Sequence, residues 1–203
     1  MKTITIFFAV FILTAALNAQ DFITYSGDGK VVLLDGTTME GLVEFSLSAP
    51  ATVTIKVGDN KAERYKAKEV KEFFVNAKHY FPLKAKGEVS VGSDLSFSYI
   101  ISADDARIRL YKNETQPIVS AGGAVPVTTT IYACLPGSEG EVYPLSAMGL
   151  NPSTKLAKYF EDCAALVEKI TKKEKGYSYG MITTDEIRQS IIEKFNLEYA
   201  GCK

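Results

Sequence analysis

The spacing of apolar residues changes near residue 151, and this change limits the fold more than any other feature. From Gly29 to about Met148 the chain consists of short runs separated by turn sequences such as Asp35-Gly36. Apolar residues alternate in several of these runs, as they do in half-buried strands. After Asn151 they recur at intervals of three and four, which places them on one helix face. We therefore predict an α+β fold in which an antiparallel β meander precedes helices.

The β region is predicted to occupy residues 20–150, with a sheet that is either open or curled and barrel-like. Val53, Ile55 and Val57 share one face of the clearest strand. In the run Arg107 to Tyr111, Ile108 and Leu110 face one way and the two arginines and the tyrosine face the other. The predicted strands are 30–34, 42–45, 51–57, 64–66, 73–75, 78–83, 88–91, 95–101, 107–111, 128–135 and 141–145.

The C-terminal region, residues 151–203, is predicted to be a two-helix hairpin packed on the sheet. Asn151-Pro152 resembles a helix N-cap followed by a proline at the first helical position. The apolar stripe of this helix ends near Lys172-Lys173. Thr183 and Glu186 have the spacing of a capping box, so a second, antiparallel helix should begin there.

The first nineteen residues are predicted to be a cleaved signal peptide. Met1-Lys2 is a short basic start, Ile4 to Leu17 is an almost unbroken apolar run, and Asn18-Ala19-Gln20 supplies small residues for cleavage after Ala19. A helix needs about 20 apolar residues to cross a bilayer, and neither this run nor any later one reaches that length. We therefore expect an exported protein of the periplasm, cell surface or exterior that does not span the membrane.

Three cysteines in an exported chain suggest one disulfide and one remaining thiol. Cys134 lies in a strand-like apolar run, where a small buried thiol is common. Cys163 and Cys202 flank the two predicted helices, and we favour a disulfide between them. Two alternatives stay open: a disulfide that involves Cys134, or a buried Cys163 with a terminal thiol at Cys202.

The charge balance gives no sign of a nucleic-acid partner. The chain has 23 Lys and Arg against 24 Asp and Glu, a net charge of −1, whereas nucleic-acid-binding domains carry basic patches. The expected partner is instead a protein or another component of the envelope.

No catalytic, metal-binding or cofactor-binding motif is evident in the sequence. His79 is the only histidine, which excludes sites that need several, and Gly137-Ser138-Glu139-Gly140 lacks the spacing of a nucleophile elbow. We therefore expect no metal and no cofactor. Paired carboxylates can lie far apart in a sequence, so a carboxylate-dependent hydrolase stays an alternative.

Two loops are candidates for a contact surface. Tyr177 and Tyr179 lie between the predicted helices, and tyrosine gives a large contact area with few rotatable bonds. Gly122 and Gly123 lie in the most loop-like segment of the β region. The alternative for the tyrosines is that they pack back over the helices.

Five segments of the chain carry a resemblance to other proteins: Gly29 to Gly36, Gly41-Leu42-Val43, Ala67 to Phe73, Arg107 to Tyr111, and Tyr159 to Cys163 with the cysteine near the end of the chain. They resemble small exported proteins of Bacteroidota, a group without an established activity. The resemblance implies the same compartment and architecture but no activity.

These observations favour an exported, non-catalytic interaction or envelope-associated protein over an enzyme. The alternatives are a carboxylate-dependent hydrolase of envelope or extracellular polymers and a carrier of a small apolar ligand. Converging carboxylates would favour the hydrolase, and a roomy apolar cavity would favour the carrier.

Overall fold

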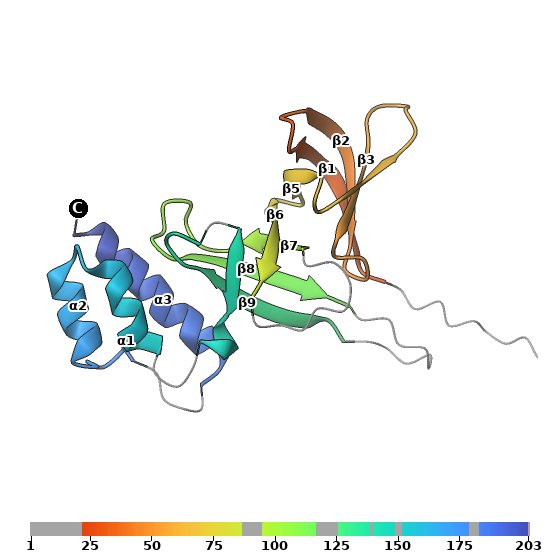
Figure 1. The fold of residues 1–203 in the computed structure, drawn as a ribbon. Helices are drawn as coiled ribbons and strands as arrows, with labels where there is room; N and C mark the ends of the chain where they lie inside the picture. The colour runs from red at the N-terminus through yellow and green to blue at the C-terminus, as the bar shows by residue number, and fades with distance from the viewer. Residues whose placement is uncertain are drawn as a thin grey trace, which may run out of the picture.

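The computed structural model has a mixed α+β fold and describes residues 22–86, 95–116, 126–138, 140–148, 152–178 and 183–202. Strands make up most of the fold, and the helices gather at one end of the sheet (Figure 1). The strands are β1 (Thr24–Leu33), β2 (Thr38–Ser46), β3 (Thr52–Lys56), β4 (Glu63–Lys66), β5 (Val70–Val75), β6 (Lys78–Ala85), β7 (Ser96–Ile100), β8 (Arg109–Thr115), β9 (Thr128–Cys134) and β10 (Glu141–Pro144). The helices are η1 (Leu145–Ala147), α1 (Pro152–Ala157), η2 (Lys158–Phe160), α2 (Ala164–Thr171) and α3 (Asp185–Ala200).

The sheet is an antiparallel meander that closes on itself at one end. Its strand order is β10-β9-β8-β7-β6-β5-β1-β2-β3-β4, and β10 also pairs with β6 in parallel. Strands β6 to β10 therefore form a closed ring, to which Lys84 and Lys86 contribute by donating backbone hydrogen bonds to residues 140 and 142. The predicted meander is confirmed in its curled form. The strand predicted at 88–91 lies outside the described residues.

Aromatic side chains fill the core formed by the first strands. The largest are Phe45, Phe73, Tyr80 and Phe97, and the rings of Phe73 and Tyr80 stack with centroids 4.5 Å apart. Offset or edge-on ring pairs add about 0.5–1.5 kcal/mol each to the burial of apolar area. Burial also raises the pKa of Tyr80, whose hydroxyl has no hydrogen-bond partner among the described residues.

The first of the two predicted helices is divided in the structure. It begins at Pro152 as expected, but α1 passes into η2 and the chain turns at residues 161–163 before α2 starts. Cys163 is the N-cap of α2 and has non-helical dihedral angles, φ −125° and ψ 81°. The second predicted helix is α3, whose N-cap is Thr184 rather than Thr183. No side-chain capping hydrogen bond is formed at Thr184, so the predicted capping box is not what starts this helix.

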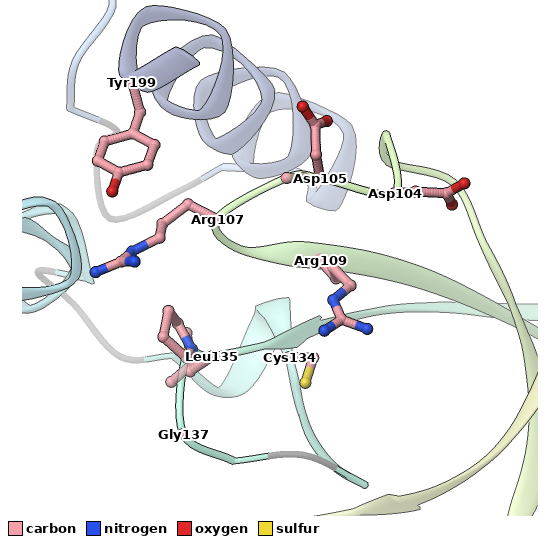
Figure 2. Close-up of a pocket in the computed structure, with 10 residues that line it drawn as sticks. Asp104, Asp105, Arg107, Arg109, Cys134, Leu135, Gly137 and Tyr199 are labelled. Atoms are coloured by element: carbon pink, nitrogen blue, oxygen red, sulfur yellow. The ribbon is translucent and has the colours of Figure 1, made fainter. Parts of the chain in front are cut away.

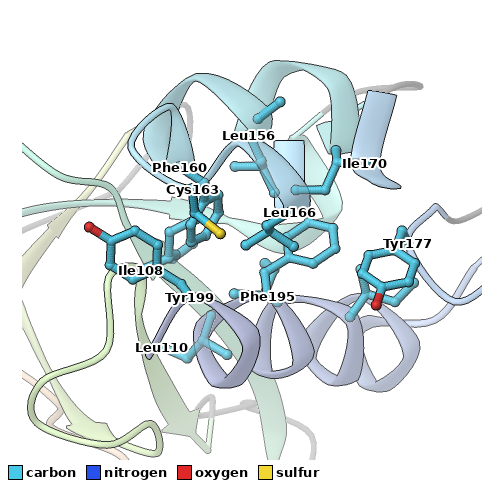
Figure 3. Packing of buried hydrophobic residues seen from close by; sticks show 14 of the residues in the cluster. Ile108, Leu110, Leu156, Phe160, Cys163, Leu166, Ile170, Tyr177, Phe195 and Tyr199 are labelled. Carbon is cyan, nitrogen blue, oxygen red and sulfur yellow. The ribbon is translucent and has the colours of Figure 1, made fainter. Parts of the chain in front are cut away.

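A second core joins the helices to the sheet. Leu156, Phe160, Leu166 and Ile170 from the divided helix pack with Phe195 of α3 (Figure 3). Ile108 and Leu110, which are both fully buried, complete this core from the sheet.

A disulfide fixes the end of α3 to the start of α2. It joins Cys163 to Cys202, with Cα atoms 5.8 Å apart and a separation of 39 positions in the chain. Closing a loop of this length stabilises the fold by about 4 kcal/mol in the chain-entropy treatment. Cys134 lies in β9 outside this disulfide, and its Sγ is 3.7 Å from the carbonyl oxygen of Ser138.

A single amide side chain attaches α3 to the sheet. Ile108, just before β8, donates its N–H to Asn196 Oδ1 at 3.0 Å. Asn196 Nδ2 in turn donates to the Ile108 carbonyl oxygen at 2.8 Å. The side chain thus satisfies both backbone groups of Ile108, as a neighbouring strand would.

The half-buried carboxylate of Glu114 on β8 forms hydrogen bonds with three other strands of the sheet. Tyr25 of β1, Lys78 of β6 and Tyr99 of β7 all donate hydrogen bonds to Glu114 of β8, at 2.8, 3.1 and 3.0 Å. The Lys78 ammonium lies 4.2 Å from the ring centroids of both tyrosines, and Lys112 pairs with the same carboxylate at 3.3 Å. The carboxylate is therefore stabilised in its charged form.

Among the described residues, no helix is both long enough and apolar enough to span a membrane.

The Glu114 cluster should make the fold sensitive to acid. Burial by itself raises the pKa of Glu114, but the hydrogen bonds from Tyr25 and Lys78 and the charge of Lys78 outweigh burial and lower the pKa to about 2. The stabilisation that comes from the ionised Glu114 carboxylate is complete above the ordinary pKa of a glutamate side chain, and it is lost as the pH falls toward 2. We expect Glu114→Gln to cost about 3 kcal/mol of unfolding free energy at pH 7, and this difference from the native protein should shrink steadily below pH 4.

Urea unfolding of the native and variant proteins between pH 7 and pH 2 measures this difference. Glu44→Gln is the matched control, because Glu44 is an exposed carboxylate on β2. A Glu114→Gln cost that does not depend on pH would contradict the role of the ionised carboxylate.

Removal of the Asn196 amide should loosen α3. Asn196→Ala leaves the N–H and carbonyl of Ile108 without their side-chain partner, which should cost about 1–3 kcal/mol of unfolding free energy. Ser190→Ala, on the exposed face of the same helix, should change this quantity by about 0.5 kcal/mol or less. Chemical denaturation of both variants provides the measurement, and equal effects would refute the docking role.

Candidate functional site

Three hollows lie where β8 begins and β9 ends. The central hollow has a volume of about 310 Å³ and lies between residues 104–109 and 134–137, beside Tyr199 of α3 (Figure 2). The helix-side hollow, about 510 Å³, lies between residues 101–106 and the C-terminal half of α3. The strand-side hollow, about 210 Å³, lies between β6 and Tyr111 of β8.

The three hollows share lining residues and therefore adjoin in a row. Asp105, Ala106 and Tyr199 line both the central and the helix-side hollow. Arg109 and Cys134 line both the central and the strand-side hollow. We refer to the three together as the groove.

Alternation along the start of β8 brings two arginines into the groove. Ile108 and Leu110 point into the helical core, so Arg107 and Arg109 project from the opposite face and are exposed. This is the arrangement that the sequence predicts for these four residues. Tyr111 continues on the face of the arginines but is buried, with its ring 5.8 Å from that of Phe81.

Arg107 is held by the helical region. Its Nε donates a hydrogen bond to the carbonyl oxygen of Tyr159 at 2.9 Å, and its guanidinium lies 5.2 Å from the ring centroid of Tyr199. Asp162 is 3.9 Å away, and its carboxylate also accepts a hydrogen bond from the Tyr199 hydroxyl. Arg107 thus fixes one wall of the central hollow.

No ion pair between described residues includes Arg109. It lies opposite Cys134 in the pairing of β8 with β9, and Figure 2 shows its guanidinium next to the cysteine sulfur. The side chains of Asp104 and Asp105 point away from it in the same view. Burial raises the pKa of Tyr111, and the charge of Arg109 together with its side-chain hydrogen bond to Tyr111 partly offsets this increase. A guanidinium has five N–H donors, so Arg109 can contact Tyr111 and still donate to an anionic group in the groove.

Apolar side chains line both ends of the groove. The helix-side hollow includes Ile101 and Leu197, and Leu197 is 76% exposed although it is a large apolar residue. The strand-side hollow includes Leu34, which is 65% exposed, together with Pro82 and Leu83. Exposed apolar residues that gather around a hollow are typical of binding surfaces.

The arrangement is suited to binding and shows no catalytic constellation in the described part of the chain. No cluster of three His, Cys, Asp or Glu residues there could hold a metal ion. His79 does not line any of the three hollows; its Nε2 lies 3.1 Å from Glu72, and its ring stacks on Phe74 at 3.8 Å. The Glu114 carboxylate already accepts hydrogen bonds from Tyr25, Lys78 and Tyr99.

Of the four contact residues predicted from sequence, the structure describes only Tyr177, which does not line the groove. Tyr177 is only 6% exposed; Lys194 Nζ lies 3.8 Å from its ring centroid, and its ring stacks with that of Phe195. Its hydroxyl donates a hydrogen bond to Glu198. Tyr177 therefore packs over the helices, the alternative that the sequence left open, and does not offer an exposed contact. Tyr179, Gly122 and Gly123 lie outside the described residues.

Sequence reasoning identified the arginine alternation but did not recognise the groove. Its walls come from segments near residues 34, 70, 82, 105, 135 and 197, which meet only in the fold. The one sequence feature that pointed to this site is the pair Arg107 and Arg109 on one face of a strand whose other face is apolar.

No family model, curated protein or solved structure matches this chain, so the geometry of the groove is the basis for a functional assignment.

Proposed function

We propose that this chain is an exported, non-catalytic binding protein of the cell envelope or exterior, and that it binds an anionic, partly apolar ligand in the groove. Three features support export: the composition of residues 1–19, the Cys163–Cys202 disulfide, and the resemblance to exported Bacteroidota proteins. Disulfides persist mainly in oxidising compartments.

The observation that carries the binding proposal is the position of Arg109. It is a cation without a carboxylate partner among the described residues, at the point where an apolar hollow meets the central one. A guanidinium can donate two parallel hydrogen bonds to a carboxylate or phosphate. Apolar walls beside it reduce the competition from water, which strengthens these hydrogen bonds.

The two alternatives differ in how they would use the groove. A carrier of a small apolar ligand would need only the helix-side hollow, whose volume of about 510 Å³ is typical of small-molecule sites. A hydrolase would need two carboxylates facing one another across the groove. Asp104 and Asp105 are adjacent in the chain and do not form such a pair. Glu193 of α3 lines the helix-side hollow together with Asp105, but it already accepts a hydrogen bond from Gln189 on its own helix. The carrier is therefore the second candidate.

Export can be tested directly by expressing residues 1–203 in a Gram-negative bacterium. We expect the protein in the periplasm with Gln20 as its first residue and with the disulfide formed, as shown by N-terminal sequencing and thiol alkylation. The control variant carries Val10→Arg and Leu13→Arg, which interrupt the apolar run and should prevent processing. An unprocessed native chain in the cytoplasm would contradict the proposal.

Binding can be tested with phenylbutyrate and its uncharged analogue phenylbutanol in an NMR titration. We expect phenylbutyrate to shift amide resonances of residues 101–109 and 134–137. Arg109→Gln should weaken its binding about tenfold or more, because a charged hydrogen bond is lost. Arg109→Lys should keep part of the affinity, and Arg64→Gln on the exposed strand β4 should leave it unchanged.

The analogue separates the two candidate functions. Equal binding of phenylbutanol would favour the carrier of an apolar ligand and contradict a role for Arg109. No shift in the groove with either compound at millimolar concentration would overturn the binding proposal.

A further inference from the structure

We infer that the occupant of the groove is an extended peptide segment with one acidic side chain between apolar side chains. This inference rests on the proposed function and specifies the class of partner. It is argued from the order of the hollows, the position of Arg109 and the two exposed leucines.

The order of the hollows favours a chain over a compact ligand. The charged central hollow lies between two hollows with apolar linings, because it shares residues with each of them. A small amphipathic molecule with one apolar part would fill the central hollow and one end. An extended peptide advances about 3.3 Å per residue and carries different side chains on one backbone, so it can fill all three hollows.

The charges in the groove favour one acidic side chain over a polyanion. Arg109 is the arginine available for bidentate binding, because Arg107 already donates to Tyr159 and contacts the Tyr199 ring. The one other cation among the described lining residues, Lys71, lies at the strand-side hollow, away from Asp105. Asp105 lines the wall between the central and helix-side hollows. A second acidic group placed there would be repelled, since like charges at close range are unfavourable.

The two exposed leucines indicate where the apolar side chains of the peptide would bind. Leu197 and Leu34 lie at opposite ends of the groove and are 76% and 65% exposed. Removal of apolar surface from water favours binding. A partner with apolar side chains on both sides of an acidic residue would cover both leucines in one binding event.

The test uses the native protein and short acetylated, amidated peptides with one glutamate between two leucines, with the spacing between leucine and glutamate varied. Isothermal titration calorimetry should show at least one spacing that binds about tenfold or more tightly than phenylbutyrate. The same peptide with Glu replaced by Gln should lose about tenfold in affinity on the native protein but little on Arg109→Gln, because the two changes remove the same contact.

Protein variants test the apolar ends. Leu197→Ser and Leu34→Ser should each weaken peptide binding severalfold, and each should have little further effect on a peptide whose leucine at that end is replaced by serine. Ile187→Ser is the matched control, because Ile187 is an exposed apolar residue of α3 outside the groove. Both leucines are largely exposed, so these variants should fold, and circular dichroism checks that they do.

The possible failures are distinguishable. If phenylbutyrate binds as proposed but no peptide binds more tightly, or if both leucine variants bind like the native protein, the peptide inference is overturned while the proposed function stands. Tighter binding of polyglutamate than of the single-glutamate peptides would overturn it in favour of a polyanion. If neither phenylbutyrate nor any peptide binds, the proposed function itself fails.

Discussion

The alternation of side chains along β8 is the constraint on which the rest of the structure depends. Leu110, with Ile108 just before the strand, points into the core shared with the helices, and Arg109 points into the groove. Further along the strand, Glu114 accepts hydrogen bonds from β1, β6 and β7. A shift of one residue would exchange the two faces and place Arg109 in the helical core. Pairing with β7 and β9 prevents that shift.

The groove depends on the position of α3 as much as on the sheet. Tyr199 and Leu197 supply two of its walls, and both are on the last turns of this helix. Asn196 fixes those turns to Ile108 by two hydrogen bonds, and the disulfide from Cys202 to Cys163 follows immediately. These contacts lie next to the hollows, so the interactions that stabilise the helical region also shape the proposed binding site.

Local patterns predicted much of the fold because they report directly on burial. The meander, the C-terminal helix and the cysteine pair were all predictable from alternation, periodicity and position. The division of the first helix was not, because the apolar stripe continues through Phe160 and Cys163 without a glycine or proline. Tyr177 was equally ambiguous: an aromatic residue between helices can face solvent or the core, and here Phe195 and Lys194 cover its ring.

The sequence by itself determined which faces of the strands and helices are apolar, because the periods of 2 and 3.6 are properties of the local backbone. It also determined that Arg107 and Arg109 share a face opposite Ile108 and Leu110. Only the tertiary structure decided that this face meets Leu197 on one side and Leu34 on the other. A hollow is made by segments distant in the chain, and their meeting depends on the closure of β10 on β6 and the docking of α3.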